Sequence, residues 1–191
     1  SIGGELAAVL LIEDPIRAEA KEVIEKLHRS GLTNIVMMTG DSDRTAKAVA
    51  AKVGVDRYFS EVLPEDKAFY VRKMRSEGHK VIMVGDGIND APALSEANAG
   101  IAVSSGAAIA REIADITITA DDLELLLVMK ELSTRLMARI RSNYRFIMSF
   151  NLGLIVFGVA GILPPATSAL LHNVSTLGIS LKSMTDLMED R

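Results

Sequence analysis

The chain has 191 residues, no cysteine and a formal net charge of −4. This length suits one domain with a sizeable core, or one domain with a small appendage. The absence of cysteine excludes a disulfide framework and thiolate metal sites. The slightly acidic balance lacks the basic surface that binds DNA or RNA, so we expect no nucleic-acid partner.

The first 122 residues alternate between short apolar runs and stretches with helical spacing of apolar residues. Continuous apolar runs are typical of strands buried on both faces, and glycines follow several of the expected helices. The alternation predicts an α/β domain, with a Rossmann-like parallel sheet and flanking helices. We expect strands at 6–12, 35–39, 80–85, 100–103 and 115–119, and helices at 14–31, 42–54, 64–76, 90–98 and 107–114.

The chain changes character near residue 142, because residues 146–181 contain no Asp, Glu, Lys or Arg. Gly161 and Pro164-Pro165 interrupt this stretch. Each half, about 144–162 and 166–184, is long enough to cross a hydrocarbon core of about 30 Å. We therefore expect a two-helix transmembrane hairpin at 144–191, joined to the 1–122 domain by a connecting helix at 123–143. A hairpin buried in a soluble core is the alternative.

Basic residues flank this stretch on both sides, with four arginines between 135 and 145 and Lys182 near its end. By the positive-inside rule both ends face the cytoplasm. The sequence thus predicts a multi-pass protein of the cell membrane with a cytoplasmic α/β domain.

Two carboxylates surround the end of the expected strand at 80–85. Asp86 ends the strand and Asp90 opens the next helix, so their oxygens can converge on one point. Mg²⁺ commonly takes one or two carboxylates and binds phosphate oxygens as well. Gly85 and Gly87 permit a tight turn and a close backbone approach. These four residues predict a magnesium site.

Further polar residues fall at neighbouring strand ends. Thr39, Gly40 and Asp41 follow one strand, Lys67 opens a helix, and Asn89 lies between the two aspartates. A hydroxyl, a cation, an amide and several carboxylates suit phosphoryl transfer, in which positioning and charge neutralisation dominate catalysis. Taken singly, each residue fits an ordinary turn or solvated helix equally well. Their order and spacing together favour a catalytic site.

The motifs TGD, LPEDK and GDGINDAPAL, in this order, resemble those of P-type cation-transporting ATPases in the haloacid-dehalogenase superfamily. This resemblance covers nearly the whole chain. It implies that Thr39, Gly40 and Asp41 line the phosphoryl site, that Lys67 neutralises its charge and that Asn89 orients the phosphorylated group. It also implies that Asp86 and Asp90 are Mg²⁺ ligands.

The family's phosphorylated aspartate lies in a DKTGT motif, and this sequence contains none. The resemblance therefore implies a carboxyl-terminal fragment, inactive alone, of an ATP-driven pump. Its partners would be the membrane, the actuator domain, the other transmembrane helices and a nucleotide-binding domain that binds most of the ATP. Two alternatives remain. A soluble phosphatase of the same superfamily predicts a DxDx(T/V) motif, which is absent, and a non-catalytic membrane protein predicts phosphate binding without turnover.

Two closing helices resemble the heavy-metal (type IB) branch of this family. Polar residues within a membrane span tend to face a pathway or a partner helix. His172, Ser175 and Thr176 share one helix face, and Asn151 lies in the preceding span. With Asn173 they are our candidates for binding the transported ion, and imidazole favours a transition-metal cation. Hydrogen bonding between helices is an equally good account.

Overall fold

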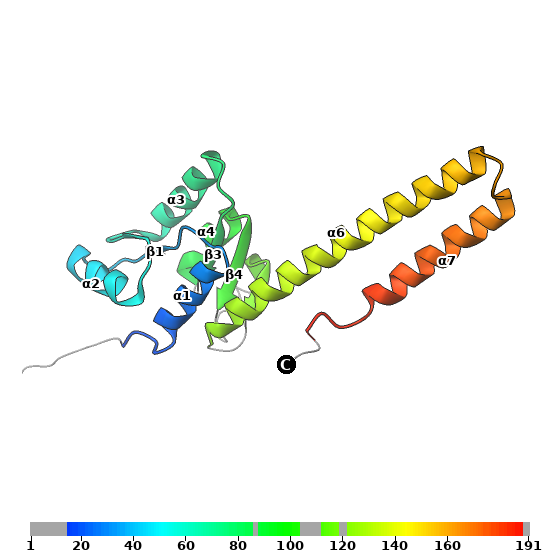
Figure 1. Ribbon diagram of the computed structural model, residues 1–191. Helices are drawn as coiled ribbons and strands as arrows, with labels where there is room; N and C mark the ends of the chain where they lie inside the picture. Colours follow the sequence, from blue (N-terminus) through cyan, green and yellow to red (C-terminus); the bar gives the residue numbers. More distant parts are fainter. Residues whose placement is uncertain (1–14, 86–87, 104–111, 119–121, 189–191) are drawn as a thin grey trace, which may run out of the picture. The chain divides into compact units, whose positions relative to one another are not determined.

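The computed structural model describes residues 15–85, 88–103, 112–118 and 122–188. It divides into two compact units, Ser1–Leu127 and Val128–Arg191 (Figure 1). The strand expected at 6–12, most of the helix expected at 107–114, and the site residues Asp86 and Gly87 lie outside the described residues. Each unit is described separately below.

The first unit contains a pair of parallel strands, β1 (Val36–Met38) and β2 (Arg57–Phe59). Helix α1 (Ala20–Arg29) precedes β1, and α2 (Asp43–Val53) connects the two strands. Gly54 ends α2 with a φ of 84°, a left-handed conformation that glycine adopts without strain. The sequence did not predict β2, because three residues with polar neighbours give too short a pattern to separate from a loop.

Three more parallel strands form a second sheet in the order β3 (Ile82–Gly85), β4 (Ala99–Val103) and β5 (Ile116–Ile118). Helix α3 (Pro64–Ser76) leads into β3, and a 3₁₀ turn η1 (Ile88–Asp90) with helix α4 (Ala91–Glu96) leads into β4. Pro64 stands at the first turn of α3, where its missing N–H costs nothing. Strands alternating with helices confirm the predicted α/β domain with parallel strands.

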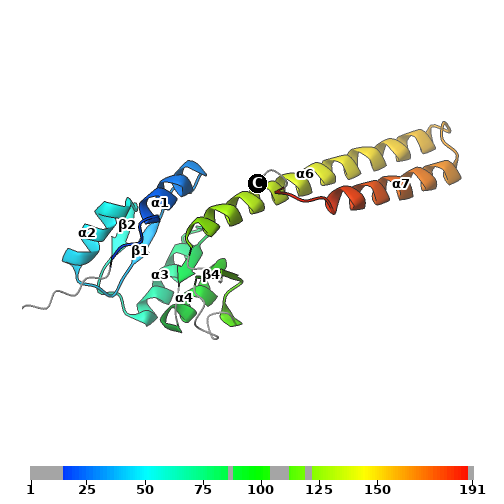
Figure 2. The same ribbon diagram turned by 90° about the horizontal axis from the view of Figure 1, so that it is seen from below.

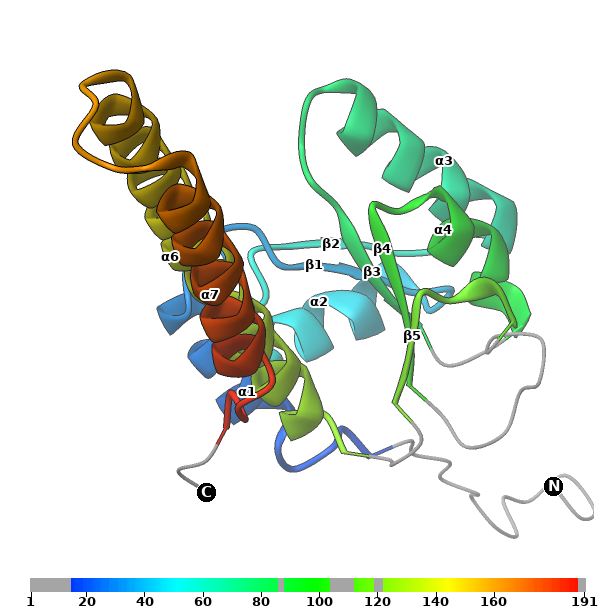
Figure 3. The ribbon, with the colours of Figure 1, turned by 90° about the vertical axis from the view of Figure 1, so that its right-hand side faces the viewer.

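Helices α3 and α4 lie together on one face of β3 and β4 (Figure 3). Val71, Met83, Ala93 and Leu94 form the buried centre of this layer, and Met38 of β1 packs against them. Leu94 approaches β4 so closely that a Cβ added to Gly100 would lie 2.7 Å from the Leu94 carbonyl oxygen. The core therefore holds β1 near β3, although no described hydrogen bond joins the two sheets.

The second unit is a hairpin of two long helices, α6 (Glu124–Val159, which begins at the end of the first unit) and α7 (Pro165–Ser183). They run side by side and antiparallel (Figure 2). Gly161, with a φ of 72°, reverses the chain between them. The expected connecting helix at 123–143 and the expected first span are thus one continuous helix.

One end of the hairpin is held by a group of hydrogen bonds that we call the arginine clamp. Arg139 donates to the carbonyl oxygens of Ser183, Thr185 and Asp186 at 2.5–3.4 Å. Arg135 donates to the carbonyl of Leu187 at 3.0 Å. The last carbonyls of a helix lack partners within the helix, and a cation there also complements the helix dipole. The clamp therefore fastens the end of α7 to α6.

No helix in the described parts of the chain combines the length and the apolar character needed to cross a membrane. The structure thus does not confirm the two spans expected at 144–162 and 166–184. The physical reason lies in the helix boundaries. The uncharged part of α6 extends only from Phe146 to the helix end at Val159, and α7 carries His172, Asn173 and several hydroxyls.

Candidate functional site

The loop after β1 is ordered by short hydrogen bonds between its own residues. The Thr39 hydroxyl donates to a carboxylate oxygen of Asp41 at 2.9 Å, and the Asp41 amide donates back to the hydroxyl oxygen at 3.1 Å. Gly40 lies between them, and an added Cβ there would meet only the Val62 carbonyl oxygen, at 3.8 Å. The loop therefore fixes one hydroxyl and one carboxylate at the carboxyl end of β1.

A second loop supports the first, and sequence reasoning missed it. After β2, the Glu61 amide donates to the Asp41 carbonyl at 2.9 Å and the Val62 amide donates to the Thr39 carbonyl at 3.0 Å. Glu61 has a φ of 54°, unusual for a residue other than glycine. Strain of this kind persists only where neighbours impose it. No residue type in the sequence marks this supporting role.

The carboxyl end of β3 holds a second polar group. Asp90 is 7% exposed, and its Oδ1 accepts a hydrogen bond from the Lys67 ammonium at 2.8 Å. Gly85 leaves the space that the Asp90 side chain occupies, because a Cβ on residue 85 would lie 2.6 Å from the Asp90 Cβ and 2.7 Å from Oδ2. Asn89 is exposed beside this pair.

The structure thus gathers the expected residues into two pairs, Thr39 with Asp41 and Lys67 with Asp90. Within the described residues, no hydrogen bond or ion pair connects one pair with the other. Both pairs stand at the carboxyl ends of parallel strands, which is where ligands bind in such folds.

The fit of a magnesium ion can be judged from Asp90. It is a nearly buried carboxylate whose Oδ2 has no described partner, and Mg²⁺ needs only one or two protein carboxylates. No group of three His, Asp or Glu side chains that could hold a metal is found in the described stretches. Asp90 fits the ion, and Asp86, the second expected ligand, is not described.

Asp56 connects α1 with the segments that precede β1 and β2, at the opposite end of these strands from Thr39 and Asp41. Its Oδ2 accepts hydrogen bonds from the Ile35 amide at 2.6 Å and from His28 Nε2 at 2.9 Å. These two hydrogen bonds, that from His28 first, lower the pKa of Asp56 below its ordinary value of 3.8. His28 therefore has a structural partner, a role that sequence spacing does not reveal.

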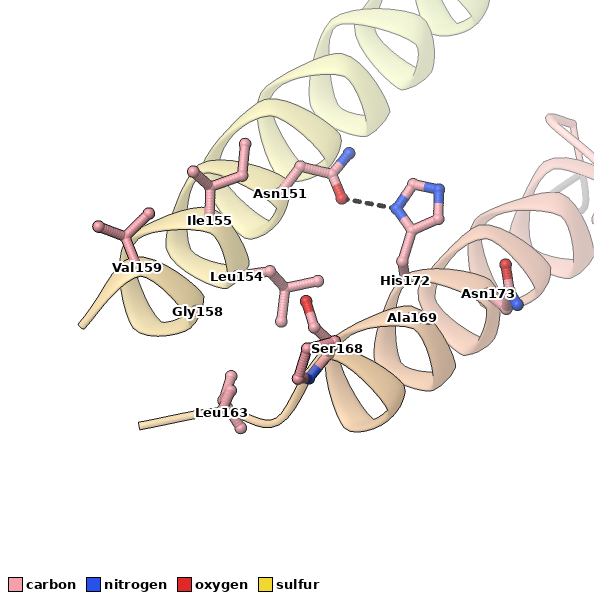
Figure 4. A pocket seen from close by; sticks show the side chains of 11 residues that line it. Asn151, Leu154, Ile155, Gly158, Val159, Leu163, Ser168, Ala169, His172 and Asn173 are labelled. Carbon is pink, nitrogen blue, oxygen red and sulfur yellow. Dashed lines mark hydrogen bonds between the residues drawn. The ribbon is translucent and has the colours of Figure 1, made fainter. Parts of the chain in front are cut away.

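The hairpin contains a pocket of about 700 Å³ that opens between α6 and α7 (Figure 4). Its lining is mostly apolar, with Asn151, His172 and Asn173 among the few polar residues. His172 Nδ1 lies 2.9 Å from Asn151 Oδ1. Asn173 points away from this pair (Figure 4).

The two hydroxyl candidates for ion binding occupy a different place. Ser175 and Thr176 both donate to the backbone carbonyl of His172, at 2.8 and 3.0 Å, and neither lines the pocket. Three of the five candidates for ion binding thus surround one cavity, and two act on the helix backbone.

Curated proteins similar to this chain include ATPases that are named for metal export or transport. It is 42% identical, over 96% of its length, to a manganese-exporting P-type ATPase from Mycobacterium leprae and to a zinc-exporting P-type ATPase from Mycobacterium marinum. A copper-transporting ATPase 2 from Rhizobium meliloti is 43% identical over 91% of the chain. The chain spans only about a quarter of these relatives, 25%, 25% and 21% respectively.

Solved structures of two related kinds of protein are also similar to this chain. A zinc-transporting PIB-type ATPase in the E2.Pi state superposes with a TM-score of 0.81 and 35% identity, covering 90% of this chain and 28% of that one. A phosphoserine phosphatase superposes with a TM-score of 0.50 and 26% identity, covering 56% of this chain and 64% of that one.

A family comparison matches residues 1–98 to the haloacid dehalogenase-like hydrolases. This match covers half of the chain and contains both polar pairs at the strand ends. The relatives described above are named as manganese-exporting, zinc-exporting and copper-transporting ATPases. The chain belongs to the haloacid dehalogenase-like hydrolase family, and its homologues are heavy-metal P-type ATPases.

Proposed function

We propose that this chain is part of an ATP-driven heavy-metal cation pump, and that it carries the distal part of the phosphorylation domain with a helical hairpin. The observation that carries the proposal is the pairing of Thr39 with Asp41 and of Lys67 with Asp90 at two strand ends, in a chain without a DKTGT nucleophile. The relatives, of which the chain spans about a quarter, supply the reaction class.

The sheets support the need for a further segment. Among the described strands, β1 hydrogen-bonds only to β2 and β3 only to β4, so each has one open edge. Met38 of β1 nevertheless packs against the core cluster that contains Met83 of β3. A strand from the remainder of the pump, ending in the phosphorylated aspartate, would bring the nucleophile to the carboxyl end where both polar pairs lie.

Each candidate residue would then have a defined role in phosphoryl transfer. The Thr39 hydroxyl, oriented by Asp41, is placed to donate to a phosphoryl oxygen. Lys67 has three N–H donors, so it can remain bonded to Asp90 and still neutralise phosphoryl charge. Asp86 and Asp90 would hold Mg²⁺, which when bound would neutralise phosphate charge. Most of the ATP contacts would come from another domain.

The hairpin would belong to the membrane part of the pump. Its outer side chains are largely apolar and exposed, Leu152, Leu170 and Leu177 each by more than 60%. Its polar residues lower the hydropathy of both helices, as expected of helices that line an ion path and are covered by other helices. The domain at 1–122 would then lie in the cytoplasm, with the helix from 123 onward as the connection.

The exported ion would be a transition-metal cation. Of the candidates, His172 has the strongest case because it offers an imidazole inside the hairpin pocket. Asn151, Asn173, Ser175 and Thr176 remain candidates for supporting roles.

The test uses the full-length protein that contains this chain, in membranes, with Mn²⁺ or Zn²⁺ and radiolabelled ATP. We expect an acid-stable phosphoenzyme, and we expect Lys67→Met to lower its rate of formation by about 10²–10³, the usual effect of removing one donor to a developing charge. Lys73→Met, an exposed residue of the same helix, is the matched control. Absence of any phosphoenzyme, or equal effects of both changes, would refute the proposal.

A soluble phosphatase is the second candidate function, favoured by the superposition with phosphoserine phosphatase. It predicts that the full-length protein hydrolyses phosphoserine or a similar monoester and shows no ATP hydrolysis stimulated by Mn²⁺ or Zn²⁺. Stimulation of ATP hydrolysis by Mn²⁺ or Zn²⁺, with no monoester turnover, would exclude it.

A further inference from the structure

The hydrogen bond between Asn151 and His172 determines which imidazole nitrogen is free. The atom of Asn151 that faces His172 is the carbonyl oxygen Oδ1, at 2.9 Å from Nδ1. A carboxamide oxygen can only accept a hydrogen bond, so Nδ1 carries the proton and donates. In the neutral imidazole the lone pair is then on Nε2.

This arrangement is the one that metal-ligating histidines adopt. A histidine that binds a metal commonly donates its other ring N–H to an oxygen acceptor, which fixes the tautomer and the ring orientation. Asn151 is half-buried on α6 and His172 lies on α7, so the acceptor and the ring come from different helices (Figure 4). The free nitrogen belongs to a ring that lines the 700 Å³ pocket.

His172 is also fixed from its own helix. Ser175 and Thr176 both donate to its backbone carbonyl, so that carbonyl accepts two side-chain hydroxyls. Hydroxyls bonded to a carbonyl one turn earlier are common in helices and bend them slightly. Ser180 and Ser183 make the same kind of bond further along α7, so what distinguishes His172 is its contact with Asn151.

We propose that Asn151 is a positioning residue that holds His172 in its Nδ1–H tautomer, so that Nε2 binds the exported cation, a borderline divalent metal such as Zn²⁺. The inference rests on the proposed pump function. It changes the role of Asn151 from a metal ligand to the orienting acceptor behind the ligand. These 191 residues supply no thiolate ligand themselves, because they contain no cysteine.

The test measures the tautomer and the metal separately, on the full-length protein that contains this chain, purified in detergent micelles. Long-range ¹H–¹⁵N spectra of the His172 ring report which nitrogen carries the proton, and a Zn²⁺ titration reports binding at Nε2. The variants are Asn151→Leu, which removes the acceptor, Asn151→Asp, which keeps one, and His172→Ala. Ser168→Ala is the matched control, since Ser168 lines the same pocket and also lies on α7.

We expect the wild-type ring to carry its proton on Nδ1. Asn151→Leu should release the tautomer and weaken Zn²⁺ binding by about 10- to 100-fold, the usual effect of losing such a partner. Asn151→Asp should restore both, Ser168→Ala should change neither, and His172→Ala should abolish the signal of Zn²⁺ bound at this site. A proton on Nε2 in the wild type, Zn²⁺ affinity within twofold after Asn151→Leu, or equal losses in Ser168→Ala would each overturn the proposal.

Failure of the pump function would look different. If the full-length protein in vesicles shows no ATP-driven movement of Mn²⁺ or Zn²⁺ while the ring behaves as stated, the proposed transport is wrong and the positioning role of Asn151 stands.

Discussion

The close approach of Asp90 to Gly85 predicts that Gly85→Ala will destabilise the first unit. The added methyl carbon would lie 2.6 Å from the Asp90 Cβ, whereas ordinary contact begins at 3.4 Å, so the two must separate by about 0.8 Å. Asp90 is 7% exposed, stands at the start of α4 and is hydrogen-bonded to Lys67. Moving it away would therefore weaken both its packing and its bond to Lys67.

The magnitude follows from two contributions. Overpacking a buried site costs about 1–3 kcal/mol, and weakening a hydrogen bond between charged groups costs about 1.5–3 kcal/mol. Because the same displacement causes both, we expect a total of about 2–5 kcal/mol, a large part of the 5–15 kcal/mol typical of a domain. Urea unfolding followed by circular dichroism measures it as a lower midpoint.

Gly40→Ala is the matched control at the end of β1. Its new methyl carbon would approach only the Val62 carbonyl oxygen, at an ordinary 3.8 Å. We expect its stability to change by less than about 1 kcal/mol, since a compatible Gly→Ala change mainly restricts the unfolded chain. If both variants unfold at the same urea concentration, the contact between Gly85 and Asp90 does not constrain the fold and our reasoning is wrong.

Three other changes have defined outcomes. Lys67→Met leaves the nearly buried Asp90 carboxylate without its cation, so it should lower the free energy of unfolding by about 2–4 kcal/mol. Urea unfolding measures this loss. An equal loss in Lys67→Arg would contradict the ion-pair explanation. The lowered pKa of Asp56 means that its stabilising contribution is complete above its unfolded value of 3.8 and is lost as pH falls through the folded value. Asp56→Asn should therefore flatten the acid limb of a stability–pH curve, and an unchanged limb would exclude this role. Arg139→Ala removes three hydrogen bonds to the end of α7 and the residues just after it. Amide exchange at 183–187 should therefore accelerate at least about tenfold. Arg141 is exposed on the same helix, and Arg141→Ala should leave the exchange rates unchanged.

The sequence predicted those parts of the fold that local chemistry determines. Helix α3 has the predicted bounds because Pro64 begins it and Gly78 follows its end, and α2 ends before Gly54 for a similar reason. Strand β2 was missed because three residues acquire their conformation from pairing with β1 rather than from their own pattern. The two membrane spans were predicted from composition alone. In the structure α6 ends at Val159 and α7 contains several polar residues, so neither helix has an apolar stretch long enough to cross a membrane.

The candidate site was predictable to a similar degree. Residue types, spacing and the family resemblance singled out Thr39, Asp41, Lys67 and Asp90 as candidates, and the structure places them in two hydrogen-bonded pairs. Which of them touch could not be predicted. The ion pair of Lys67 with Asp90 depends on how α3 packs beside η1, a long-range arrangement that no local sequence pattern encodes.

The free edge of β3 has a consequence for the solubility of this chain on its own. Within the described residues β3 pairs on one side only, and its Ile82 and Val84 are 47% and 39% exposed. A free apolar edge offers unpaired N–H and C=O groups to a second copy, although the four-residue length of β3 limits such pairing. If the chain is part of the proposed pump, the strand that would bring the nucleophile would also cover this edge.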